Sequence, residues 1–275
     1  MFQSVVTHGK LLDLSSPRVM AILNFTTDSF YTSCSTLAEK EILGLASNAI
    51  EQGADILDLG ACSTRPNSSP VSEDEEWKRV SYALQVIRYH WKDVIISIDT
   101  FRVAVAQGAL ALGADMINDV SGGGVDFSMW DLVCAARVPY ILTHSLEISL
   151  SKNETYNNVL SEMLDFFQRG LDKLYRQGVS DVIIDPGFGF GKTIEQNYTI
   201  LRGLEIFQEL HVPILVGLSR KSMFYKALSV TPNDVLPATT AAHMLALQRG
   251  AHLLRVHDVA AAKQAIKIFQ LDKNE

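Results

Sequence analysis

The stretch DVIIDPG, residues 181–187, is a short apolar run that ends in an aspartate, a proline and a glycine. Seven other short apolar runs also end in polar or glycine residues: RVMAILN (18–24), ADILDLG (54–60), VIISIDT (94–100), ADMINDVSGG (114–123), VPYILTH (138–144), VPILVGLSR (212–220) and AHLLRVHD (251–258). Near-continuous apolar runs of this length are typical of strands that are buried on both faces, as in a parallel sheet. The eight runs therefore predict eight parallel strands.

Segments with a helical period lie between these runs. In EKEILGLASNAIEQG (39–53) the apolar positions 42, 45, 46, 49 and 50 form one helical stripe, and the segment ends in a glycine. Further glycines stand before the next runs at Gly113, Gly178 and Gly250, where the left-handed conformation that ends a helix is favourable. Strands that alternate with helices predict an α/β fold, a (β/α)8 TIM barrel.

One domain over residues 1–275 accommodates the whole pattern. The segment before Arg18 predicts a short hairpin with its turn at His8 and Gly9, which we expect to close the N-terminal end of the barrel. An open doubly wound sheet is the alternative fold, but eight repeats without a dinucleotide fingerprint favour the barrel.

Composition restricts the classes of function. A net charge of −7 supplies no broad phosphate-neutralising face, so nucleic-acid binding is not expected. The chain has no run of eighteen apolar residues and no N-terminal signal pattern, so we expect no association with a membrane. The three cysteines, Cys34, Cys62 and Cys134, lack C-x-x-C spacing, which argues against a disulfide framework or a zinc site and fits a cytoplasmic protein.

The glycine-rich stretch DPGFGFGKT (185–193) superficially resembles a phosphate-binding P-loop. That motif requires a glycine at the position of Pro186. The dinucleotide-binding pattern fails as well, because Lys192 or Ile194 stands where its third glycine belongs. The stretch therefore needs another interpretation.

Polar residues follow the predicted strands, where the active sites of such barrels lie. One group consists of carboxylates and an amide: Asp99, Asn118 and Asp185. The other is cationic or suited to metals: Asn24, Arg65, Lys221, Arg255 and His257. The first group suits a heterocycle with several N–H donors, and the second suits phosphates. A phosphorylated heterocycle fits both, although Asp119 and His144 also fit structural roles as a cap and a core histidine.

Seven motifs in order resemble the dihydropteroate synthase family: ILNFTTDSF (22–30), STRP (63–66), SIDT (97–100), INDVSGG (117–123), DPGFGFGKT (185–193), SRKS (219–222) and RVHDV (255–259). The resemblance covers the chain from Val19 to Phe269. It implies a TIM barrel that is usually a homodimer. Such an enzyme joins p-aminobenzoate to 6-hydroxymethyl-7,8-dihydropterin diphosphate with the help of Mg²⁺, and it yields dihydropteroate and pyrophosphate in folate synthesis.

The resemblance also implies roles for individual residues. The expected catalytic residues are Arg65, Asp99, Asp185, Lys221, Arg255 and His257. The expected pterin pocket consists of Asp99, Asn118, Asp185, Phe190, Gly217, Lys221 and Arg255. The diphosphate is expected at Asn24, Thr64, Arg65, Arg255 and His257, with Asn24 also the Mg²⁺ ligand. The expected p-aminobenzoate pocket consists of Phe30, Thr64, Pro66, Ser219, Arg220 and Lys221. Lys192 and Thr193 are expected outside the pocket, at the start of a helix.

The first loop departs from the family pattern N-V-T-P-D-S-F-S-D-G-G. Thr27 replaces the proline, Thr32 replaces the second aspartate, and Ser33 and Cys34 replace the glycine pair. These departures leave open an alternative, a pterin-binding paralogue with weak or lost synthase activity. A related methyltransferase acting on methyltetrahydrofolate is disfavoured by the STRP, SRKS and RVHDV motifs, because its chemistry has no diphosphate to hold.

Overall fold

The computed structural model describes residues 4–25, 36–61, 71–146 and 158–273. Within these ranges eight strands form one parallel sheet: β3 (Arg18–Asn24), β4 (Ile56–Gly60), β5 (Ile95–Asp99), β6 (Met116–Asp119), β7 (Tyr140–Thr143), β8 (Val182–Asp185), β9 (Leu215–Val216) and β10 (Leu253–Val256). Their order is β8-β7-β6-β5-β4-β3-β10-β9, and a parallel bridge between Ile184 and Ile214 brings the two ends together. The predicted (β/α)8 barrel is therefore confirmed.

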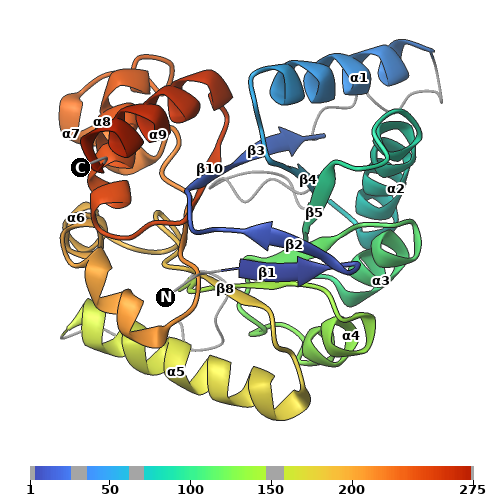
Figure 1. Cartoon of the computed structure of the whole chain (residues 1–275), viewed down its shortest axis with the longest axis horizontal. Coiled ribbons are helices and arrows are strands. Elements are labelled where there is room, and N and C mark those ends of the chain that lie inside the picture. Colours follow the sequence, from blue (N-terminus) through green and yellow to red (C-terminus); the bar gives the residue numbers. More distant parts are fainter. Residues whose placement is uncertain (1–3, 26–35, 62–70, 147–157, 274–275) are drawn as a thin grey trace.

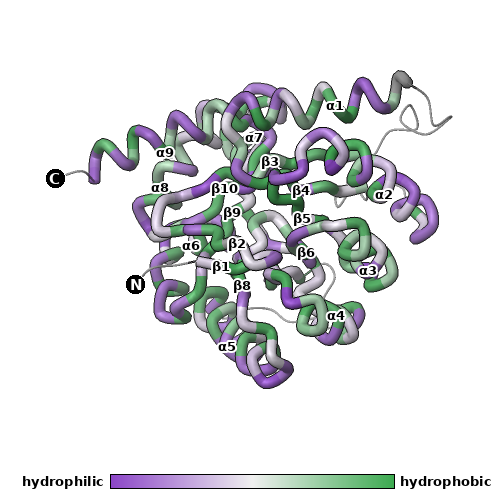
Figure 2. Tube along the Cα trace, turned by 45° about the vertical axis from the view of Figure 1, so that its right-hand side comes forward, coloured by the Kyte–Doolittle hydropathy of each residue, from purple (hydrophilic) through white to green (hydrophobic). Residues whose placement is uncertain are grey.

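Helices surround the barrel (Figure 1). They are α1 (Thr36–Glu51), α2 (Glu73–His90), α3 (Val103–Ala111), α4 (Ser128–Ala136), α5 (Val159–Gln177), α6 (Ile194–Arg202), α7 (Ser222–Leu228), α8 (Leu236–Gln248) and α9 (Val259–Lys273), with the 3-10 helix η2 (Leu204–Leu210) after α6. The strands are mainly hydrophobic while the helices alternate in character (Figure 2), as expected for a sheet covered by amphipathic helices. Their contact forms the larger hydrophobic core.

The N-terminal hairpin consists of β1 (Ser4–Thr7) and β2 (Lys10–Asp13), which pair antiparallel. Its turn is at His8 and Gly9, as predicted, and both have positive φ angles. Its apolar residues Val5, Leu12 and Leu14 are buried against the first interior residues of the barrel strands. The hairpin therefore covers the N-terminal end of the barrel, in agreement with the prediction (Figure 1).

The strand period makes the interior apolar at one end and polar at the other. Residues two apart on a strand point to the same side. Met116 of β6 belongs to the apolar cluster under the hairpin, so Asn118 points into the barrel nearer its C-terminal end. The same spacing relates Ile56 to Asp58 on β4, Ile183 to Asp185 on β8 and Leu253 to Arg255 on β10.

Candidate functional site

The strand register aligns polar residues in a row at the C-terminal end of the barrel. Asn24 pairs with Gly60, Gly60 with Asp99, and Asp99 with Asn118. A Cβ atom on Gly60 would lie 3.1 Å from Asn24 Oδ1 and 3.5 Å from Asp99 Oδ2. Glycine at this position therefore leaves space beside these two side-chain oxygens.

Arg255 lies among carboxylates beside this row. Its Nε donates to Asp58 Oδ2 at 2.6 Å, and its Nη2 donates to Asp99 Oδ2 at 2.5 Å. Asn118 Nδ2 also donates to Asp58 Oδ2, at 3.0 Å. Asp58 is fully buried, so its carboxylate fixes both the guanidinium and the amide.

Burial and the neighbouring charges both shift the pKa values of this cluster. It raises the pKa of Asp99 to about 7, although the charge of Arg255 opposes the shift. Burial also acts to lower the pKa of Arg255, but the carboxylates of Asp58 and Asp99 outweigh it and raise that pKa. Arg255 therefore remains a cation, while Asp99 exchanges its proton close to neutral pH.

Asp185 ends β8 on the far side of the barrel from Asn24. Its Oδ1 accepts a hydrogen bond from the Gly187 N–H at 2.8 Å, and its Oδ2 lies 3.9 Å from the position of a Cβ on Gly217. Burial raises the pKa of Asp185, and the Gly187 N–H, Lys221 and Arg255 act in the opposite direction. The Lys221 ammonium lies 4.4 Å from the centroid of the Phe190 ring.

A third group follows β9 and β10. Ser219 Oγ lies 3.0 Å from His257 Nδ1 and accepts from the His257 backbone N–H at 3.2 Å. His257 is exposed at the mouth of the barrel. Arg220, with a positive φ of 54°, directs its guanidinium to Asp258, at 3.0 and 2.7 Å.

The structure thus brings the described candidates together at one end of the barrel: Asn24, Asp99, Asn118, Asp185, Phe190, Gly217, Ser219, Lys221, Arg255 and His257, with Arg220 beside them. Phe30, Thr64, Arg65 and Pro66 lie outside the described residues, as do Thr27, Thr32, Ser33 and Cys34. Among the described residues, no group of three or more His, Cys, Asp or Glu side chains could hold a metal ion. A metal at Asn24 would need most of its ligands from elsewhere.

One residue of the site received no role from the sequence. Asp58 stands inside an apolar run, and only its pairing with Arg255 reveals its importance. Lys192 and Thr193 were expected at the start of a helix, and Thr193 does cap α6, while Lys192 is buried beneath the glycine-rich loop. His144 proves to be a core histidine, because its side chain is buried and its ring packs on Phe166, and this burial lowers its pKa to about 3.

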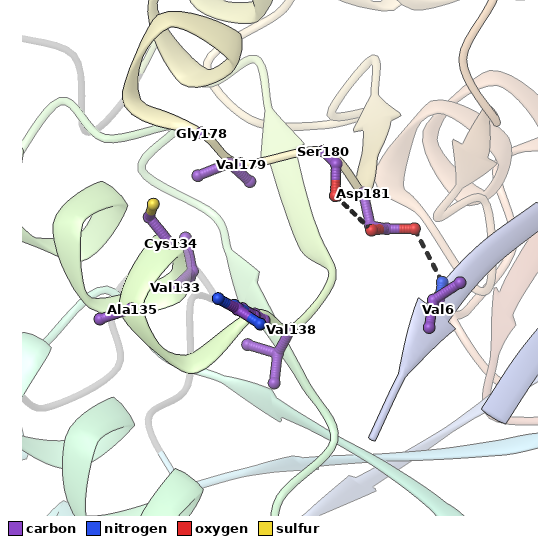
Figure 3. A pocket seen from close by; sticks show the side chains of 10 residues that line it. Val6, Val133, Cys134, Ala135, Val138, Gly178, Val179, Ser180 and Asp181 are labelled. Carbon is purple, nitrogen blue, oxygen red and sulfur yellow. Dashed lines mark hydrogen bonds between the residues drawn. The ribbon is translucent and has the colours of Figure 1, made fainter. Parts of the chain in front are cut away.

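A separate hollow of about 650 Å³ lies at the opposite end of β8 (Figure 3). Its lining includes Asp181, about 13 Å along an extended strand from Asp185. Asp181 already accepts hydrogen bonds from the Val6 N–H at 2.7 Å and from Ser180 Oγ at 2.6 Å. This carboxylate anchors the hairpin, so we assign the chemistry to the C-terminal end, where several charged side chains converge.

Known proteins match this chain over nearly its whole length. The pattern of the family described as "Pterin binding enzyme" matches residues 20–257. A dihydropteroate synthase from Haemophilus influenzae is 36% identical over 271 residues, covering 97% of this chain and 98% of the relative. The structure of Xanthomonas albilineans dihydropteroate synthase with 4-aminobenzoic acid has a TM-score of 0.91 at 35% identity and covers all of both chains. The same enzyme in complex with 7,8-dihydropteroate has a TM-score of 0.86 at 33% identity, with 99% of each chain covered.

Among the helices that the structure describes, none is both long enough and apolar enough to span a bilayer.

Proposed function

Because this chain belongs to the family of pterin-binding enzymes and has dihydropteroate synthase function, we propose that the polar cluster at the C-terminal end of its barrel carries out that reaction. The enzyme is a transferase of folate biosynthesis. It condenses 6-hydroxymethyl-7,8-dihydropterin diphosphate with p-aminobenzoate. The observation that carries the residue assignment is the convergence of Asp99, Asn118 and Asp185 with the cations Lys221 and Arg255.

The carboxylates and the amide form the pterin pocket in this proposal. Asp185 accepts N–H groups of the pterin's amino-pyrimidine edge, because the Gly187 N–H already orients its carboxylate. Asn118 and Lys221 complete the polar contacts, and Phe190 lies against the ring. The Oδ1 atom of Asn118 is buried without a hydrogen-bond partner among the described residues, which fits an acceptor reserved for a ligand.

The reaction begins at the bond between the pterin methylene carbon and the diphosphate oxygen. This bond breaks, and its electron pair leaves with pyrophosphate, so positive charge develops on the pterin. Asp99 and Asp185 stabilise that charge, while Arg255 and His257 hold the leaving anion together with Arg65 and Thr64 of the sequence motif. A nearby ion pair with Arg255 keeps Asp99 in place throughout.

Mg²⁺ fits this site as an ion held mainly by substrate phosphates. Asn24 Oδ1 faces the space at Gly60, and an amide oxygen is a ligand that Mg²⁺ accepts. When bound, the ion supplies charge neutralisation for the departing pyrophosphate.

The amine nitrogen of p-aminobenzoate then forms a bond with the methylene carbon and loses a proton. An aniline nitrogen is unprotonated near neutral pH, so no strong base is required. Ser219, Arg220 and Lys221 shape this pocket with Phe30, Thr64 and Pro66. Since Asp258 binds the Arg220 guanidinium, we assign Arg220 its contribution to the pocket through the backbone of the Ser219–Lys221 turn.

The decisive assay measures pyrophosphate release and dihydropteroate formation from purified protein, with and without p-aminobenzoate and with and without Mg²⁺. Dihydropteroate formation that depends on both additions supports the proposal. Tight pterin binding without turnover would instead indicate the paralogue that the altered first loop suggests.

We also propose that residues 1–275 form one domain and that the protein is a cytoplasmic homodimer, as the family resemblance implies. Light scattering coupled to gel filtration measures the mass in solution. A mass of one chain at micromolar concentration would contradict the dimer.

A further inference from the structure

Three backbone carbonyl groups converge on the ammonium of Lys192. Lys192 Nζ donates to His144 O at 2.8 Å, to Gly187 O at 2.8 Å and to Phe190 O at 3.5 Å. The side chain is only 8% exposed. Burying an ammonium is costly unless its N–H groups are hydrogen-bonded, so these bonds restrict the backbone positions of His144, Gly187 and Phe190.

The loop that Lys192 holds, residues 187–191, carries contacts to the proposed pterin site at both of its ends. At the first end, the Gly187 N–H donates to Asp185 Oδ1. At the second, the Phe190 ring lies under the Lys221 ammonium. Lys192 bonds the carbonyl groups of both Gly187 and Phe190, so a single cation sets the spacing between the two ends.

The loop has little freedom to compensate if this cation is removed. Gly187 has a φ of 65°, and a Cβ there would lie 2.1 Å from His144 O, so the loop is packed directly on the end of β7. On the other side, Asn197 of α6 accepts from the Gly189 N–H at 2.8 Å and donates to Lys192 O at 3.2 Å. Lys192 Nζ binds His144 O and Gly187 O, the carbonyl groups on the two sides of the contact between the loop and the end of β7.

We propose that Lys192 is a positioning residue for pterin recognition: it holds residues 187–191 against the end of β7 and thereby aims Asp185 and Phe190 at the pterin. The inference rests on the proposed pterin-binding role of Asp185. Lys192 does not reach the substrate in this arrangement and acts through the backbone. Its charge also favours the ionised form of Asp185, since burial raises the pKa of that carboxyl and Lys192 opposes the shift.

The chain offers a matched control at the opposite end of the barrel. Arg88 of α2 likewise binds backbone carbonyl groups, those of Lys92 at 3.1 Å, Val94 at 2.7 Å and Gly113 at 2.7 Å, and it also pairs with Asp115 Oδ2 at 2.6 Å. Replacing Arg88 by Met removes a carbonyl-binding cation without touching the proposed pterin site. It therefore reports the effect of lost stability alone.

The experiment compares wild type, Lys192→Met, Lys192→Gln and Arg88→Met by calorimetric titration with pterin diphosphate, by steady-state kinetics and by thermal unfolding. We expect Lys192→Met to raise the Kd for pterin diphosphate about tenfold or more, since three buried acceptors lose their donor. The KM for p-aminobenzoate at saturating pterin should stay within about twofold, because Ser219 and Arg220 are held separately by His257 and Asp258. Lys192→Gln keeps two donors and should recover part of the pterin affinity.

Unchanged pterin affinity in Lys192→Met, or an equal loss in Arg88→Met at the same loss of melting temperature, would overturn the inference. If Lys192→Met does not fold, Lys192→Gln is tested in its place, and unchanged pterin affinity in that variant would overturn the inference. Absence of pterin binding in the wild type would refute the proposed function itself, whereas normal wild-type binding with an unaffected Lys192 variant refutes only the positioning role.

Discussion

Replacing Asp185 by Asn tests the pterin assignment most directly, because the change removes a charge and adds almost no volume. The Gly187 N–H, which donates to Oδ1 at 2.8 Å, should retain the amide oxygen of the new side chain as its acceptor. The amide NH₂ group then occupies the position of Oδ2, near Gly217, and faces the ligand. A donor would therefore meet the donors of the pterin.

The expected loss follows from the hydrogen bonds. The hydrogen bond that Oδ2 would accept is lost, with a net contribution of about 1.5–3 kcal/mol, which corresponds to a Kd about 10–10² times higher, and the two facing donors add to this loss. The folded state should not suffer equally, because burial raises the pKa of Asp185 and the neutral side chain avoids that cost of burying a charge. We expect the free energy of unfolding to stay within about 1 kcal/mol of wild type or to increase.

Calorimetric titration with pterin diphosphate and urea unfolding measure the two quantities. Asp181→Asn is the matched control, since Asp181 precedes the same strand and its carboxylate accepts hydrogen bonds from Val6 and Ser180. That variant should lose stability at the hairpin and retain pterin affinity. A loss of less than tenfold in the pterin affinity of Asp185→Asn would refute the assignment of this carboxylate.

Other parts of the site give further predictions. Asp58→Asn should raise the Kd for pterin diphosphate about tenfold or more in titrations. Arg255 loses a charge-assisted hydrogen bond of about 1.5–3 kcal/mol, and Asn118 meets an altered partner. Wild-type affinity in this variant would contradict the prediction. The pKa of Asp99 is raised to about 7 in the folded protein, so the folded state binds this proton more tightly than the unfolded state. The resulting stabilisation is fully present below about pH 4 and is lost as pH rises through 7, and the free energy of unfolding falls by up to ~1.4 kcal/mol per pH unit. Urea unfolding of Asp99→Asn and wild type from pH 4 to 8 should show this difference in slope, and parallel curves would exclude it. Thr32→Asp should raise kcat if the aspartate of the family pattern aids catalysis, and an unchanged kcat would show that this chain compensates in another way.

The order of strands and helices could be predicted because it depends on local chemistry. Each apolar run is long enough for one buried strand, and each helical stripe ends in a residue such as Gly53 or Gly178 that stops a helix. The hairpin follows similarly from its turn at His8 and Gly9. These signals lie within about ten residues of the elements they define.

The candidate site was predictable where a residue ends a strand. Asp99 and Asp185 are the last residues of β5 and β8, and parallel strands bring their carboxyl ends to one side of a barrel. The motif resemblance added particular roles. Asp58 lies near a strand end but received no role, because a single polar residue within an apolar run is recognised as functional only when its partner is known.

The amino-acid sequence by itself determined that the strands alternate with helices and which residues terminate each strand, since these depend on local runs and periods along the chain. Only the tertiary structure decided which charges meet. Arg255 lies 197 residues from Asp58 and 156 from Asp99, and their pairing depends on the closure of the barrel. Lys192 binds a carbonyl group 48 residues away, at His144, for the same reason: hydrogen bonds depend on distances in space, which the folded sheet sets.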